Sequence, residues 1–145
     1  MQEIANKISF AYDSVDEAFP ACDPGVTPFG SRVLVQIRTP KKKTAGGIML
    51  VGETRETEHY NTQVAKVIAV GSLAFKNRNT MESWPEGSWC APGDFVRVPK
   101  YGGDRWEVPL GMKDGNNESA MFVIFNDLDI IGQVTGDPLA IKAFI

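Results

Sequence analysis

One short apolar run in this chain has the composition of a protein-binding site. It consists of Gly46, Gly47, Ile48, Met49, Leu50 and Val51. The surrounding stretch, from Pro40 to Thr62, is otherwise polar and poor in strand-forming residues. Exposed Ile, Met and Leu side chains lower solubility unless a partner covers them, and two glycines leave the backbone free to change conformation on contact. The sequence therefore predicts a mobile loop at 40–62 that binds another protein.

Motifs for catalysis are missing from the sequence. It contains no Gly-x-Ser-x-Gly, no phosphate-binding Gly-x-x-x-x-Gly-Lys and no His-Glu-x-x-His. The one histidine, His59, lies in the polar stretch, and the distant Cys22 and Cys90 favour two free thiols over a disulfide. Asp127 and Asp129 would share one face of a strand, but a turn or interface role is favoured over catalysis. We expect no enzymatic activity and no metal or cofactor.

Composition narrows the class of protein further. With 145 residues and 43% hydrophobic content, the chain has enough apolar material for one domain with a modest core. A net charge of −3 argues against a large nucleic-acid surface. The N-terminus lacks the pattern of a signal peptide, and no apolar stretch is long enough to span a bilayer. We expect a cytoplasmic protein that binds neither nucleic acid nor membrane.

The elements that must position the loop are short apolar strands separated by Gly, Pro and Asn turns. We expect strands at 32–37, 63–70, 94–98, 105–108, 121–125 and 129–134. Irregular segments are expected at 72–93 and 109–119. Several short strands with turns between them are typical of a small sandwich or barrel, so the expected fold class is all-β.

The first 30 residues differ from the rest. Ser14 and Glu17 have capping-box spacing. One apolar stripe at helical spacing is formed by Ile4, Ile8, Ala11, Val15 and Phe19. The sequence predicts a short, partly helical N-terminal extension that packs against the barrel or is partly disordered.

Several blocks of sequence resemble the GroES small-chaperonin family, and they occur in the family's order. The blocks are 31–35, 44–50, 65–71, 92–96, 99–103 and 125–132, with Gly-Gly-Ile-Met-Leu in the second. The resemblance extends over about 31–134. It divides the chain into an extension at 1–30, an irregular GroES-like β-barrel at 31–134 and a tail at 135–145.

The resemblance implies a function. It implies a homoheptameric ring that caps a GroEL-type chaperonin and encloses a client protein, while the chaperonin binds the ATP. The side chains of Ile48, Met49 and Leu50 would contact the chaperonin, and Gly46 and Gly47 would form the flexible approach. Neighbouring subunits would meet through six residues, namely Arg32, Val33, Leu34, Ile130, Ile131 and Val134.

Some segments depart from the family pattern. Besides the two terminal extensions, the roof segment 72–91 carries the bulky residues Trp84 and Trp89, which either close or line the dome or act as local packing anchors. The 109–119 segment is longer than expected. Divergent subunits of this kind resemble versions carried by bacteriophages, whose client would be a capsid protein.

Two other functions are alternatives to a co-chaperonin. A GroES-like domain of a zinc-dependent oxidoreductase would need metal ligands and a dinucleotide-binding half, which the sequence does not offer. A small nucleic-acid-binding barrel could use Lys41, Lys42 and Lys43 together with the tryptophans. The glutamates at 53, 56 and 58 instead make this stretch a mixed, solvated one.

Overall fold

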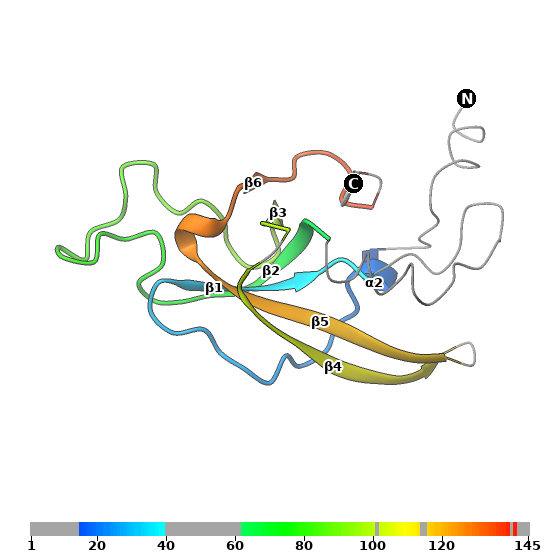
Figure 1. Cartoon of the computed structure of the whole chain (residues 1–145). Coiled ribbons are helices and arrows are strands. Elements are labelled where there is room, and N and C mark those ends of the chain that lie inside the picture. Colours follow the sequence, from blue (N-terminus) through cyan, green and yellow to red (C-terminus); the bar gives the residue numbers. More distant parts are fainter. Residues whose placement is uncertain (1–14, 40–61, 101, 114–115, 140, 142–145) are drawn as a thin grey trace, which may run out of the picture.

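A computed structural model describes residues 15–39, 62–100, 102–113, 116–139 and 141. Its six strands form one antiparallel sheet in the order β4-β5-β1-β2-β3-β6 (Figure 1). The strands are β1 Arg32–Ile37, β2 Val64–Val70, β3 Phe95–Arg97, β4 Asp104–Lys113, β5 Asn116–Asn126 and β6 Gly132–Gln133. Two short helical elements accompany them, α2 Val15–Ala18 and the 3-10 helix η1 Asp127–Asp129. The expected all-β fold class is confirmed.

Strand β1 is the centre of the sheet, because it pairs with β5 on one side and with β2 on the other. Its side chains alternate between two apolar clusters. Val33, Val35 and Ile37 belong to the larger cluster, whereas Leu34 belongs to a smaller one on the opposite face. A strand covered on both faces needs a nearly continuous apolar sequence, which explains why β1 could be predicted.

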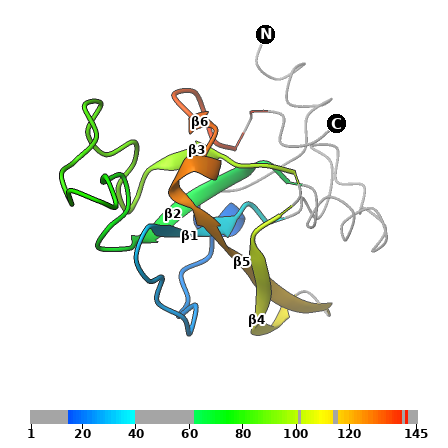
Figure 2. The ribbon, with the colours of Figure 1, turned by 60° about the vertical axis from the view of Figure 1, so that its left-hand side comes forward.

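The larger cluster lies between the sheet and the roof segment 72–91. The roof segment contributes Ala74, Phe75 and Cys90, and Ile130 enters just after η1. Figure 2 shows this segment projecting away from the strands. Only one isolated bridge, between Lys76 and Ser83, was found in it, so the expectation of an irregular segment is confirmed.

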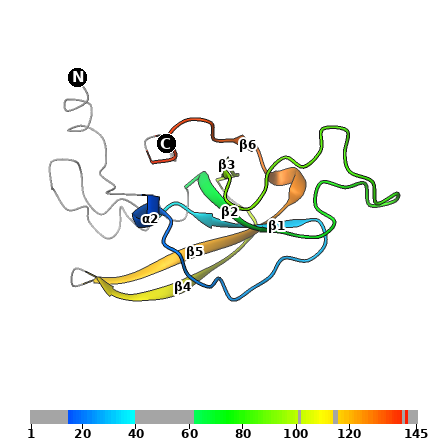
Figure 3. The ribbon, with the colours of Figure 1, turned by 180° about the vertical axis from the view of Figure 1, so that it is seen from behind.

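The opposite face of the sheet is covered by the N-terminal chain between α2 and β1. We call residues 19–28 the strap, and Figure 3 shows it running from α2 across β5 and β4. Two side chains of the sheet hold it by hydrogen bonds: Gln36 Nε2 donates to the Pro20 carbonyl at 2.8 Å, and Trp106 Nε1 donates to the Pro24 carbonyl at 2.8 Å. The strap and α2 thus attach the N-terminal extension to the sheet. The spacing at Ser14 and most of the predicted stripe lie outside the described residues.

The prediction of an irregular segment at 109–119 is wrong. Residues 109–113 and 116–119 belong to the long antiparallel pair of β4 and β5, in which Val108 lies opposite Ala120 and Lys113 opposite Asn116. β4 is an edge strand of the sheet in the described part of the chain, so the missing N–H of Pro109 breaks no ladder on its outer side there. A register shift between Pro109 and Gly111, with Gly111 at φ +92°, absorbs the irregularity.

The expected strand at 129–134 is only partly present. Its first residue belongs to η1, and β6 contains just Gly132 and Gln133, paired with β3. Asp127 and Asp129 consequently do not share a strand face: Asp127 is buried in the turn and Asp129 is exposed. β6 pairs with β3, which is itself only three residues long.

Replacement of Gly71 by alanine is expected to destabilise the fold by about 1–3 kcal/mol, the usual cost of overpacking. A Cβ atom at this position would overlap the Gly30 carbonyl and lie 3.0 Å from the Arg32 carbonyl oxygen, both backbone atoms that cannot turn away. Urea unfolding at matched protein concentration measures the effect. Gly136→Ala is the control, because a Cβ there meets nothing within 4 Å. Equal stability of the two variants would contradict this packing.

Candidate partner-binding surfaces

The predicted chaperonin-binding residues Gly46, Gly47, Ile48, Met49, Leu50 and Val51 lie outside the described residues. The structure does describe the two ends of the segment that carries them. Arg38 and Thr39 precede the segment, Thr62 and Val64 follow it, and all four side chains are buried. The Arg38 amide donates to the Val64 carbonyl at 3.0 Å, so the chain leaves and re-enters the sheet at neighbouring positions.

The six residues expected at the subunit interface occupy different environments. Four are buried within this chain, namely Val33, Leu34, Ile130 and Val134. Arg32 is exposed at the start of β1, and Ile131 is 62% exposed. Among these six, therefore, only Arg32 and Ile131 present their side chains to solvent.

The structure also reveals exposed apolar side chains that sequence reasoning missed. Phe29 is 78% exposed, Leu128 is 70% exposed and Val26 is also exposed. Phe29 and Leu128 flank the paired ends of β1 and β5, where the Asp127 amide donates to the Ser31 carbonyl at 2.9 Å. A sequence signal existed, since both are large apolar residues within turns. Large apolar side chains left in solvent near the same ends of two central strands make this a candidate protein-binding surface.

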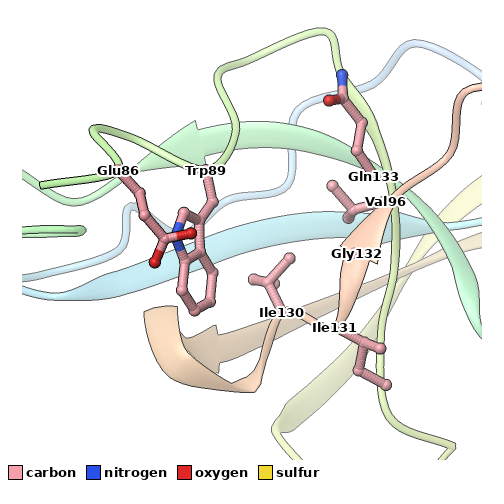
Figure 4. Close-up of a pocket in the computed structure, with 7 residues that line it drawn as sticks. All are labelled: Glu86, Trp89, Val96, Ile130, Ile131, Gly132 and Gln133. Carbon is pink, nitrogen blue, oxygen red and sulfur yellow. The ribbon is translucent and has the colours of Figure 1, made fainter. Parts of the chain in front are cut away.

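A hollow opens beside Ile131, between the roof segment and the edge of the sheet (Figure 4). Its volume is about 320 Å³, and it is lined by Glu86, Trp89, Val96, Ile130, Ile131, Gly132 and Gln133. β6 is an edge strand of the described sheet, and both of its residues are exposed. An edge strand offers unpaired backbone groups to a strand of another chain. This side of the molecule combines an accessible edge with a hollow whose lining is both polar and apolar.

The two tryptophans of the roof segment pack within the chain. Trp84 lies edge-on to Phe75 with ring centroids 5.5 Å apart, and the centroids of Trp84 and Trp89 are 5.0 Å apart. Phe75 has a positive φ of 61°, which is uncommon for a bulky residue. The Asp127 carboxylate accepts hydrogen bonds from the Phe75 amide at 2.9 Å and the Leu128 amide at 2.8 Å. Asp127 therefore links the roof segment to η1.

No group of three His, Cys, Asp or Glu residues that could hold a metal ion was found among the described residues. Both cysteines are free thiols. Burial raises the pKa of the Cys90 thiol to about 11, with a smaller contribution from Asp94. Cys90 is thus held as a neutral thiol inside the larger core.

Iodoacetamide at pH 8 should label Cys22 of the folded protein well before Cys90, because the thiolate is the reacting form and Cys90 is both buried and protonated. Burial and then Asp23 also raise the Cys22 pKa, but its side chain is only half-buried. Mass spectrometry of tryptic peptides over time measures both rates. Labelling of Cys90 should rise as the pH approaches 11, and in urea both cysteines should react alike. Equal rates in the folded protein would contradict this placement.

Comparison with known proteins defines the class of this all-β chain. Residues 25–134 match the family model described as chaperonin 10 Kd subunit. The co-chaperonin GroES of Tetragenococcus halophilus is 30% identical over 107 residues, which cover 74% of this chain and 96% of that protein. The chain belongs to the chaperonin 10 family. No helix in the described part of the chain is long and apolar enough to cross a membrane.

Proposed function

We propose that this protein is a co-chaperonin subunit that assembles into a ring and caps a GroEL-type chaperonin. The observation that carries the proposal is the family match over residues 25–134, which includes all six strands of the sheet. The relative from Tetragenococcus halophilus is itself a co-chaperonin. The chaperonin would bind and hydrolyse the ATP in the cytoplasm, and this chain would act without chemistry of its own.

The ring would hold the chaperonin through the apolar run Ile48, Met49 and Leu50, approached by Gly46 and Gly47 and followed by Val51. Burial of three such side chains gains about 1.5–3 kcal/mol each. Ordering of about six residues costs about 1–2 kcal/mol each in backbone entropy. The net binding free energy of one copy would therefore be close to zero. Several copies on one ring make every contact after the first intramolecular, which gives a cap that holds and can still dissociate.

Met49→Asp should abolish capping while the ring stays assembled, because a buried carboxylate without a partner is costly. The measurement is co-sedimentation of the ring with a GroEL-type chaperonin in the presence of ATP. Met81→Asp is a matched control, since Met81 is a 54% exposed methionine of the roof segment. Normal capping by Met49→Asp would refute the role of the apolar run, and failure of the unmodified chain to bind would refute the proposed function.

The subunit contacts of this ring would use the exposed apolar turns described above. Three large apolar side chains are exposed to solvent in the single chain: Phe29 and Leu128 near the ends of β1 and β5, and Ile131 beside β6. A strand of the neighbouring subunit could extend the sheet at β6. The resemblance of the sequence to the GroES family suggests seven subunits.

Leu128→Asp combined with Ile131→Asp should shift the native mass from the ring to the single chain. Both side chains are exposed in one chain, so the substitutions leave its core intact, but in an interface the carboxylates would be buried without partners. Native mass spectrometry measures the assembly, and circular dichroism checks the fold. Met81→Asp again serves as the control and should keep the ring mass. An unchanged ring in the double variant would place the subunit contacts elsewhere.

A further inference from the structure

Two segments outside the family match meet at one place on the sheet. The match covers residues 25–134, so α2 with Phe19 at one end and residues 135–141 at the other lie beyond it. Figures 1 and 3 place α2 and the last described turn of the tail at the same end of the sheet, beside the end of β1. The segment 40–61 leaves and re-enters the sheet at this end. Terminal segments outside the family match therefore lie beside the two ends of the predicted binding loop.

The N-terminal segment contacts the residues on both sides of the 40–61 segment. The Thr39 amide, the last described before the segment, donates to the Ala18 carbonyl at 2.8 Å. On the returning side, Ala18 and Phe19 are buried in one apolar cluster with Val64 of β2. The Phe19 ring also lies on Phe95 of β3, with centroids 5.1 Å apart. The first strand after the segment is thereby packed against the N-terminal extension.

The tail reaches the same place through Arg38. The Arg38 side chain is 1% exposed. Its Nη1 donates to the Pro138 carbonyl at 2.9 Å and to the Ile141 carbonyl at 2.8 Å. Asp137 shapes the turn that presents these carbonyls, because its carboxylate accepts from the Leu139 amide at 2.9 Å and its carbonyl accepts from the Ile141 amide at 3.1 Å. A buried cation needs such acceptors.

Apolar contacts complete the attachment of the tail. Leu139 and Ile141 pack against the cluster that contains Phe19 and Val64, and Val134 joins it from the chain after β6. The Val134 amide donates to the Phe95 carbonyl at 2.8 Å. The cluster thus contains residues from the N-terminal extension, from two strands and from the tail.

We propose that α2, Phe19 and the tail residues 137–139 and 141 form a clamp on Thr39 and Val64, which flank the 40–61 segment. Arg38 is the positioning residue that joins the tail to the sheet. This inference rests on the proposed function, because it assigns the clamp a role in presenting the apolar run to the chaperonin. A segment whose ends are held in fixed directions explores less space before binding. Several such segments on one ring can then bind several sites on the partner at once with a smaller loss of entropy.

The test compares two variants with the unmodified ring. Arg38→Met keeps the length of the side chain but removes its donors, and a chain ending at Gly136 lacks the tail turn. Arg78→Met is the matched control, because Arg78 is an exposed arginine that bonds only a side chain outside the clamp, Ser31 Oγ at 3.1 Å. Three quantities are measured: ring mass, hydrogen exchange of the Thr39 amide, and affinity for a GroEL-type chaperonin with nucleotide.

Both variants should keep the ring mass, exchange the Thr39 amide faster, and bind the chaperonin about tenfold or more weakly, since the loss at each loop is multiplied over the ring. Both changes remove the bonds from Arg38 to the tail, so the loss of affinity in their combination should be smaller than the sum of the two separate losses. The control should match the unmodified ring in all three quantities.

Unchanged affinity in the truncated chain would overturn the clamp's role, and so would additive losses in the combined variant. If Arg38→Met does not fold, the truncated chain decides alone. Failure of the unmodified ring to bind any GroEL-type chaperonin would instead refute the proposed function. In that case, Thr39 exchange in the truncated chain still tests whether the clamp holds the segment, and unchanged exchange would refute it.

Discussion

Burial of strand β1 on both of its faces is the constraint on which the rest of the described structure depends. Its odd-numbered side chains, such as Val35, need a cover on one side, and its even-numbered ones, such as Leu34, need a cover on the other. The neighbouring strands of the sheet lie beside β1 and do not cover either of its faces. The roof segment and the chain around Ile130 provide one, and the strap of residues 19–28 provides the other. Segments with little regular structure are therefore integral parts of the core.

Buried polar side chains fasten these irregular segments to the sheet. Asp127 joins η1 to the roof segment through the Phe75 amide, and Gln36 joins β1 to the strap through the Pro20 carbonyl. Arg38 joins the end of β1 to two carbonyls of the tail. A polar group that is buried loses its hydration and must find a partner. Each of these groups has one in a segment distant in sequence, so it specifies where that segment lies.

The sequence predicted the central strands well and the peripheral ones less well, for a physical reason. β1 and β2 lie inside the sheet, so burial requires a run of apolar residues that is visible in the sequence. The β4–β5 hairpin was missed beyond Val108 because Pro109 and Gly111 are normally strand breakers. An edge position and a bulge tolerate both of them. The strand expected at 129–134 was too long, because its pairing with β3, a strand distant in sequence, decides which residues belong to β6.

The sequence alone determined the fold class and the family, because ordered blocks of apolar strand residues and turn glycines record which residues must be buried. It also pointed to the apolar run that ends at Leu50 as the feature for a partner, which stays a prediction. The sequence did not indicate that Leu128 and Ile131 are exposed whereas Val33 and Ile130 are buried. All four are aliphatic, and their exposure depends on contacts with distant segments. The meeting of Ala18, Arg38 and Pro138 likewise required the fold, because a hydrogen bond across 100 residues leaves no local pattern in the sequence.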